Sequence, residues 1–427
     1  MNVRSEPEAT GSARTATGLP APTSNPRFPL LDSLRALAAL AVVLTHTAFV
    51  SGAIFNSSFK GILAHLNIGV TLFFLISGFV LYRPFVAARE RGQSPPSVLR
   101  YARRRFLRIA PAYWLALTVL AVVPGLYGVF TGNWWVYYGL LQPYPIFHAG
   151  AVCARHTEGC GIAQTWSLSI EVAFYLVLPL YGLAMARLTA RSSPRVGRRR
   201  DLVVLAALGI ASAVLRFWVL YRPRYTWMYG TVLGHFLWFA LGMGLAVVSV
   251  GSHGREADWG PTRFLRDHSF VPWAAGIGGF LLLSLRVLPV SASPYDLTTA
   301  EQVIEHVGFG LIVLALMLPA VFGHDAGGPV RRLLGARALR WLGDISYGIF
   351  LWHLTVMFAL ADHGALTWVP GNRFVSLTLV TLAVTIPLAA ASFYLVERPL
   401  MRVGGRRRPP AAPAAAAAPE LAQTAPA

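Results

Sequence analysis

The stretch LDSLRALAALAVVLTHTAFVS, Leu31 to Ser51, predicts a helix long enough to cross the hydrocarbon core of a membrane. Arg35 and His46 lie eleven positions apart in it, about three helical turns, so both side chains share one face about 16 Å apart along the axis. Ionisable residues at membrane depth are rare and usually face a protein-lined cavity, so we interpret the pair as part of a functional site. Alternatively, Arg35 snorkels to the membrane surface and His46 is a hydrogen-bonded contact between helices.

The composition of the whole chain is typical of a polytopic membrane protein. Apolar residues make up 55% of the 427 and charged residues 13%, whereas a soluble surface of this size needs far more charge. Apolar runs of about 20 residues, each long enough to span a bilayer, predict ten helices. They lie at about 31–51, 67–87, 107–126, 166–186, 202–221, 229–250, 270–289, 303–322, 342–361 and 373–396. The predicted fold is an all-α membrane bundle of about ten transmembrane helices, occupying residues 29–402.

The distribution of Lys and Arg predicts how the bundle is oriented. Of the 37 basic residues, 29 fall in the segments that a cytoplasmic N-terminus would place inside, and four fall in the outer loops. Cytoplasmic loops carry such an excess, so we expect both termini in the cytoplasm and a multi-pass protein of a bacterial cytoplasmic membrane. The formal net charge of +19 then reflects topology. We therefore expect the lipid bilayer, and no nucleic acid, as a partner.

The two ends of the chain differ from the bundle in composition. Residues 1–28 are rich in Pro, Ser, Thr and Ala and lack the apolar core of a signal peptide, which predicts a disordered cytoplasmic leader. Residues 403–427 are largely Pro/Ala low-complexity sequence, which predicts a disordered cytoplasmic tail.

The longest predicted outer loop, residues 127–165, holds both cysteines of the chain. Cys153 and Cys160 would form a disulfide closing a small ring if this loop faces the oxidising side. A zinc site needs about four ligands, and the spacing of the nearby His148 and His156 fits no metal motif, so we expect no metal. The Trp and Tyr side chains of the loop favour an interfacial belt over a lining for a sugar-like acceptor.

A basic stretch, RYARRRFLRIAPAYW (Arg100 to Trp114), leads into the third predicted helix. Arg103, Arg104, Arg105 and Arg108 form a cationic cluster at its inner mouth. One interpretation is anchoring at the inner surface together with binding of anionic lipid. The other is a dock for the phosphates of a cytoplasmic donor, because guanidinium groups match phosphate geometry.

Six segments occur in order between residues 28 and 402. They are the Arg35-to-His46 helix, FFLISGFVLYRP (Phe73 to Pro84), RRFLRIAPAYW (Arg104 to Trp114), WSLSIEVAFY (Trp166 to Tyr175), GDISYGIFLWH (Gly343 to His353) and FYLVERP (Phe393 to Pro399). Each segment is short and apolar, so the order of the six on ten predicted helices is what makes the pattern specific. In this the chain resembles the membrane-bound acyltransferase-3 family, the O-antigen acetylase-like proteins.

The resemblance implies transfer of an acyl group, usually acetyl from acetyl-CoA, to a hydroxyl of a sugar-bearing molecule at the membrane. Arg35 and His46 match the family's essential arginine-to-histidine motif. Arg105 and Arg108 match the basic pair before the third helix. We therefore expect an O-acetyltransferase that uses acetyl-CoA or another acyl-CoA. The expected acceptor is a cell-envelope carbohydrate, a glycolipid or a glycosylated metabolite.

O-acylation needs a base for the acceptor hydroxyl, and His46 is the natural candidate because free histidine titrates near neutrality. By the predicted topology, His46 and Glu171 both lie about five residues from the outer ends of their helices. We predict that Glu171 hydrogen-bonds His46 and fixes its tautomer, while His46 acts as general base or transiently carries the acyl group. With Arg35 they form the predicted catalytic group. Alternatively, Glu171 is a buried carboxylate satisfied by Ser167, Tyr175 or a facing helix.

Five further residues are assigned to substrates. Tyr347, near the inner side, and His353, about mid-membrane, are predicted to help bind the donor, although a hydrogen-bonded packing histidine fits His353 equally well. Trp166, Ser169 and Tyr175 are assigned to the acceptor. Trp166 fits the start of a helix as well, and the sequence does not separate these roles.

Two other functions are compatible with polar residues in a membrane. A proton-coupled transporter or flippase of an envelope precursor would also use intramembrane Arg, His and Glu. Transporters often contain internal repeats, and residues 31–221 and 229–396 show no such repetition. A scaffold without chemistry would leave Arg35 and His46 unexplained. The sequence therefore favours the enzyme.

Overall fold

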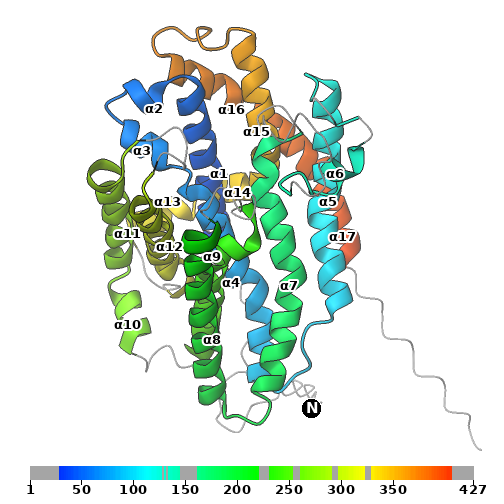
Figure 1. Ribbon diagram of the computed structural model, residues 1–427, viewed down its shortest axis with the longest axis vertical. Helices are drawn as coiled ribbons and strands as arrows, with labels where there is room; N and C mark the ends of the chain where they lie inside the picture. The colour runs from blue at the N-terminus through cyan, green and yellow to red at the C-terminus, as the bar shows by residue number, and fades with distance from the viewer. Residues whose placement is uncertain are drawn as a thin grey trace, which may run out of the picture.

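The computed structural model describes residues 28–126, 129–130, 133–144, 161–220, 230–252, 260–290, 297–322 and 328–405. Within these ranges the chain is helical and contains no strand, which confirms the predicted all-α fold (Figure 1). Nine helices in this part of the chain are long and apolar enough to cross a membrane, and one bent pair brings the number to ten. The predicted leader lies outside the described residues except for residue 28, and so does the predicted tail except for residues 403–405.

The helices that span the bundle begin and end close to the predicted apolar runs. They are α1 (Pro29–Val50), α4 (Ile68–Glu90), α5 (Val98–Val122), α7 (Trp166–Leu188), α8 (Pro194–Leu215), α9 (Val232–Ser252), α11 (Phe270–Leu282), α12 (Thr299–Phe322), α15 (Ser346–Asp362) and α16 (Arg373–Ser392). The main difference is that α5 and α8 start eight or nine residues early. Arginine is a good helix former, so the basic turns continue the helix beyond the apolar run.

Shorter helices connect the spans or cover their ends. They are α2 (Ala53–Asn56), α3 (Lys60–His65), α6 (Trp134–Tyr138), α10 (Gly260–Asp267), α13 (Pro329–Leu334), α14 (Arg337–Asp344) and α17 (Arg398–Gly405). A 3₁₀ turn, η3 (Ala163–Thr165), directly precedes α7.

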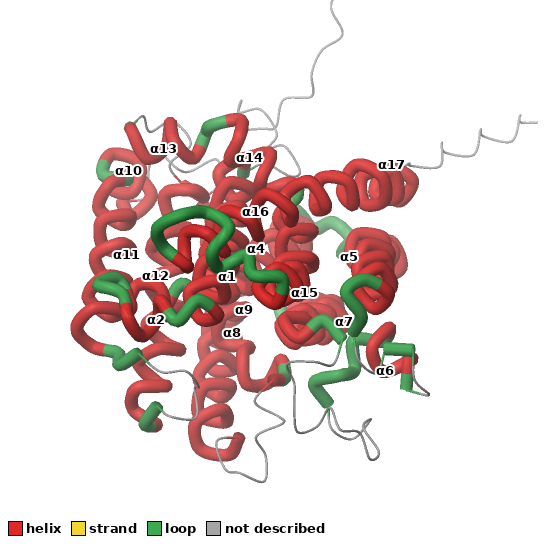
Figure 2. Tube along the Cα trace, turned by 90° about the horizontal axis from the view of Figure 1, so that it is seen from above, coloured by secondary structure: helices red, strands yellow, loops and turns green. Residues whose placement is uncertain are grey.

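Helix α4 lies in the middle of the bundle, where it packs against α1, α7, α9 and α12 (Figure 2). Two glycines make its contact with α9 close. A Cβ atom at Gly78 would collide with the carbonyl of Phe239, and one at Gly242 would collide with the carbonyl of Leu75. Small residues allow helix backbones to approach in membranes. The contact therefore fixes which side of α4 faces α1 and α7.

The predicted helix over residues 342–361 corresponds to α15 except for its first residues, which belong to α14, and the two helices meet at a bend of 69°. At the bend, Gly343 lies against the backbone of Asp32 in α1, where a side chain would collide with the Asp32 carbonyl. Ser346 donates a hydrogen bond to the Gly343 carbonyl at 2.8 Å. Helix α14 therefore packs on the first turns of α1, next to Arg35.

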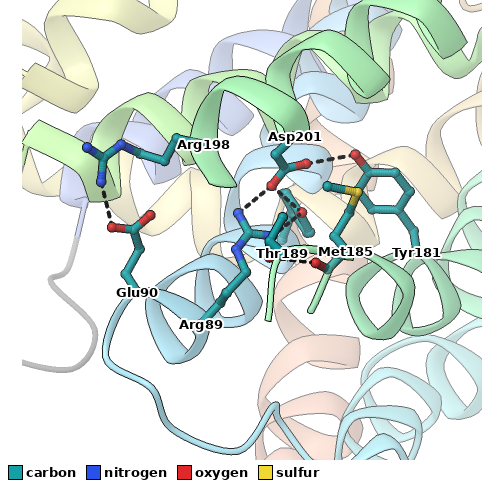
Figure 3. Close-up of polar contacts among 8 residues, drawn as sticks. Arg89, Glu90, Tyr181, Met185, Thr189, Arg198 and Asp201 are labelled. Atoms are coloured by element: carbon teal, nitrogen blue, oxygen red, sulfur yellow. Dashed lines mark hydrogen bonds and ion pairs between the residues drawn. The ribbon is translucent and has the colours of Figure 1, made fainter. Parts of the chain in front are cut away.

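A buried polar network joins α4, α7 and α8 (Figure 3). Asp201 of α8 is fully buried and accepts a hydrogen bond from the Arg89 guanidinium at 2.5 Å. Tyr82 and Tyr181 donate to the same carboxylate at 2.6 and 2.7 Å. Because the buried charges are paired, the network fixes three helices without an isolated charge in the interior.

Candidate active site

Three hollows that share lining residues lie toward the inner end of the bundle, the end that the charge distribution predicts to face the cytoplasm. The widest, about 710 Å³, is a groove between α1, α4 and α14. A second opening of about 280 Å³ lies between α1, α4 and α5. A narrow cavity of about 70 Å³ lies between α1, α4, α5, α7 and α15. Arg35 and Val80 line all three, so Arg35 lies where they meet.

Three guanidinium groups line the narrow cavity: Arg35 from α1, and Arg105 and Arg108 from α5. Arg35 pairs with Asp32 one turn earlier, at 3.0 Å. Arg105 and Arg108 form no ion pair with any residue that the structure describes. Glu171 is the one carboxylate among the residues lining this cavity. The cavity therefore carries an excess of positive charge that suits an anionic ligand.

The structure contradicts the predicted hydrogen bond between Glu171 and His46. Glu171 accepts hydrogen bonds from the Ser77 hydroxyl of α4 and from the Tyr175 hydroxyl, the latter at 2.6 Å. The alternative in which Tyr175 satisfies a buried carboxylate is the one that the geometry supports. Ser77 was missed, although it lies in the family-like segment 73–84.

The predicted depth of Glu171 is wrong because α7 starts inside the bundle, below its outer end. Gln164, in the turn before α7, is buried and donates to the backbone carbonyls of Phe350 and Leu351, both at 3.0 Å. These residues adjoin His353 on α15, so α7 starts at about the level of that histidine. Glu171 lies five residues after the start of α7, which is about 8 Å closer to the inner end. The sequence gives no sign of this role of Gln164, because its partners are 186 and 187 positions away.

The partner of His46 is His353. The His46 Nδ1 and His353 Nε2 atoms are 3.1 Å apart, and the ring centroids are 5.1 Å apart. His353 is fully buried and His46 is partly exposed. Neither is among the residues lining the narrow cavity, but Phe350, which does line it, has its ring centroid 6.0 Å from that of His353. The histidine pair therefore lies just beyond the outer end of the cavity.

The residues predicted to bind the donor occupy different places. Tyr347 lines the narrow cavity, and its hydroxyl donates to the Ile109 carbonyl at 3.0 Å. Arg104 is exposed and lines only the second opening. His353 contacts His46, which brings together two residues that the sequence analysis assigned to different roles.

Of the three residues predicted to bind the acceptor, Tyr175 alone lines the narrow cavity. The buried Ser169 hydroxyl lies 2.8 Å from the Leu140 carbonyl oxygen and 3.1 Å from that of Thr165, so it fixes the start of α7 against the preceding chain. Trp166 is 38% exposed at the first position of α7.

The predicted disulfide between Cys153 and Cys160 lies outside the described residues. In the same loop, Trp134 and Trp135 of α6 are described and exposed, which fits an interfacial position. The described ranges contain no group of three or more His, Cys, Asp or Glu side chains that could hold a metal ion.

Comparison with known proteins identifies relatives of this chain. A family model described as "Acyltransferase domain" matches residues 28–392. The peptidoglycan O-acetyltransferase OatA of Listeria monocytogenes is 26% identical over 394 residues, which cover 88% of this chain and 56% of that protein. The putative peptidoglycan O-acetyltransferase YrhL of Bacillus subtilis is 28% identical over 401 residues, covering 89% of this chain and 56% of YrhL. The exopolysaccharide production protein ExoZ of Rhizobium meliloti is 28% identical over 354 residues, covering 80% of this chain and 91% of ExoZ.

The chain thus spans about half the length of OatA and YrhL. No solved structure matches it. The family model covers most of the chain, including the helix with Arg35 and His46 and every residue that lines the three hollows except Met401. On this evidence the protein belongs to the acyltransferase-3 family.

Proposed function

We propose that the protein is an integral membrane O-acetyltransferase. It takes acetyl-CoA from the inner end and acetylates a hydroxyl of an envelope carbohydrate or another sugar-bearing acceptor. Membership of the acyltransferase-3 family supports the reaction class. The names of OatA and ExoZ refer to peptidoglycan O-acetylation and exopolysaccharide production, and they support an envelope polymer as acceptor. The donor and the role of His46 are argued from the geometry of the site.

The observation that carries the donor assignment is the set of guanidinium groups around the narrow cavity. Arg105 and Arg108 have no carboxylate within ion-pairing distance in the described part of the chain, and Arg35 has only Asp32. Arg105 and Arg108 are half-buried, and such cations without an anionic partner suit a ligand that supplies the negative charge. Coenzyme A carries phosphate groups, and arginine binds phosphate oxygens in a two-point geometry.

The sizes of the hollows agree with the shape of this donor. Ligand pockets typically enclose about 300–1,000 Å³, and the groove of about 710 Å³, with Arg337 and Arg340 in its wall, is large enough for a nucleotide. The narrow cavity of about 70 Å³ is far smaller, so only a thin segment of the donor, such as part of the pantetheine arm, would enter it. An arm passing Tyr347 and Phe350 would bring the thioester toward the histidine pair.

His46 would act on the acceptor. Its imidazole takes the proton of the acceptor hydroxyl as that oxygen attacks the thioester carbonyl. The tetrahedral intermediate then loses the CoA thiolate, which receives the proton from His46, so the products are the acetyl ester and free CoA. The alternative in which His46 transiently carries the acetyl group uses the same ring lone pair. Arg35 is about 16 Å from His46 along α1, too far to stabilise the reacting carbonyl, so we assign it to donor binding.

The donor assignment is tested with purified protein in lipid nanodiscs and labelled acetyl-CoA. Arg108→Ala should raise the Kd and KM for acetyl-CoA about 10- to 100-fold, because one charge-assisted hydrogen bond is worth about 1.5–3 kcal/mol. Arg105→Ala should raise the Kd and KM for acetyl-CoA in the same way. Arg103→Ala is the matched control, because Arg103 is exposed on the same helix and lines none of the three hollows. Unchanged donor affinity in both Arg105→Ala and Arg108→Ala would remove the donor from this cavity.

The same purified protein, placed in proteoliposomes or kept in detergent, distinguishes an enzyme from a transporter. Substrate movement across proteoliposomes without formation of an acetyl ester would favour the proton-coupled transporter, which the buried Arg, His and Glu side chains also suit. Ester formation from acetyl-CoA in detergent, where no membrane separates two compartments, would exclude it as the main function.

A further inference from the structure

We propose that His353 is a positioning residue that sets the tautomer of His46, so that Nδ1 of His46 carries the ring proton and Nε2 carries the free lone pair. This inference rests on the proposed function, because it states how His46 is prepared to act as a base. It changes the role of His353 from a donor-binding residue to the hydrogen-bond partner of the base.

The Nδ1 atom of His353 faces the backbone of its own helix, α15. This atom lies 3.1 Å from the carbonyl oxygen of Ile349 and 2.9 Å from that of Phe350. A carbonyl oxygen can only accept a hydrogen bond. Nδ1 of His353 must therefore carry a hydrogen.

The charge of His353 follows from its surroundings. Its side chain has no exposed surface, and no acidic side chain of the described residues forms an ion pair with it. Its ring neighbours are Phe350 and His46. An isolated charge in such a place is strongly disfavoured, so His353 is neutral. A neutral ring with a hydrogen on Nδ1 has a bare Nε2, which is a hydrogen-bond acceptor.

The acceptor role of His353 Nε2 determines the hydrogen-bonding role of His46. Nε2 of His353 is 3.1 Å from Nδ1 of His46. Since Nε2 of His353 accepts, Nδ1 of His46 must donate and carries the hydrogen. A neutral His46 then has its lone pair on Nε2, the position from which it can take a proton. The chain of hydrogen bonds therefore runs in one direction, from His46 through His353 to the backbone of α15.

The carbonyl at the end of this chain is itself held in place. Gln164 donates to the Phe350 carbonyl at 3.0 Å, so the same oxygen meets both Gln164 and His353. When His46 takes a proton, its Nδ1–H bond to His353 becomes a charge-assisted hydrogen bond, which is stronger than a neutral one. In serine hydrolases a buried aspartate holds the catalytic histidine in this way. Here a neutral imidazole fills the position, which avoids a second buried charge in the membrane.

The test is direct observation of the His46 ring protons in the full-length protein. Histidine is labelled with ¹⁵N, the protein is placed in lipid nanodiscs, and the His46 signals are identified by their loss in His46→Gln. A protonated ring nitrogen and a bare one have well-separated ¹⁵N chemical shifts. In the unmodified protein we expect Nδ1 of His46 to be protonated and Nε2 to be bare. Protonation of Nε2 with a bare Nδ1 would overturn the proposal.

Two variants at position 353 separate hydrogen bonding from packing. His353→Gln keeps an acceptor for the His46 Nδ1–H group, so the tautomer and most of kcat should be retained. His353→Leu fills the space but removes the Nε2 acceptor 3.1 Å from Nδ1 of His46, so the other tautomer should gain population. In that variant kcat should fall about 100-fold, within the range for a positioned base, at an unchanged KM for acetyl-CoA. His363→Gln, at the exposed end of α15, is the control and should change neither the tautomer of His46 nor kcat.

The NMR result does not depend on turnover, so the two ideas fail separately. If His353→Leu is folded and keeps the original His46 tautomer, His353 is a packing residue and the proposal is wrong. If the tautomer changes as expected while acetyl transfer is unaffected, the positioning is real but His46 is not the base. If His353→Leu does not fold, the unmodified protein and His353→Gln still decide.

Discussion

At the residue scale, the candidate site depends on the contact between His46 and His353. The spacing of Arg35 and His46 predicts a shared helix face, and in the structure Arg35 lines the hollows while His46, further along α1, contacts His353. The partner of His46 lies 307 positions away on another helix, and no local pattern encodes such a pair. The prediction of a Glu171–His46 contact was wrong because it assumed that the helix carrying Glu171 starts at the outer surface of the membrane. Gln164 and the turn at η3 make α7 start deeper.

The corrected position of Glu171 changes what its substitution should do. Glu171→Gln keeps side-chain shape and an acceptor for Tyr175, while removing the one negative charge from a cavity with three guanidinium groups. Donor affinity should therefore stay equal or increase, and kcat should change less than 10-fold, far below the roughly 10⁴-fold loss when the acidic partner of a catalytic histidine is replaced. Steady-state kinetics with labelled acetyl-CoA measure both quantities. A loss in kcat of the larger size, with the fold intact, would restore Glu171 as the partner of His46.

At the element scale, hydropathy and charge predict the helices well because length and composition are local properties. The bend between α14 and α15 was not predictable, because Gly343 and Asp344 near the start of this run do not by themselves mark a bend. Its cause is tertiary, since Gly343 packs against the Asp32 backbone where no side chain fits. The same contact positions α14 at the wall of the wide groove, beside the Asp32–Arg35 pair.

Adding a methyl group at the bend should therefore weaken the protein and the donor site together. Gly343→Ala should destabilise by about 1–3 kcal/mol, as overpacking of a close contact does, and should raise the KM for acetyl-CoA. Thermal unfolding in detergent and donor titration measure the two effects. Gly278→Ala is the matched control, because Gly278 lies on a helix face of α11 with nothing nearby, and alanine is the better helix former. Equal melting temperatures for the two variants would show that the Gly343 contact is not tight.

At the scale of the whole molecule, the bundle has two levels to which we assign different functions. The inner level holds the guanidinium-lined hollows, and the level about 16 Å further out holds the histidine pair, with Tyr347 and Phe350 between them. The charge distribution predicts that the inner level faces the cytoplasm, which would supply the donor from one side and the acceptor from the other. Donor binding and chemistry are thus expected to be separable by mutation.

That separation gives the most direct measurement of the central claim: binding and transfer of labelled acetyl-CoA by His46→Ala, side by side with the unmodified protein in nanodiscs. The account predicts an unchanged Kd for acetyl-CoA and a loss of acetyl transfer of about 100-fold or more, as expected when a positioned base is removed. Acetyl transfer by His46→Ala at the rate of the unmodified protein would contradict it.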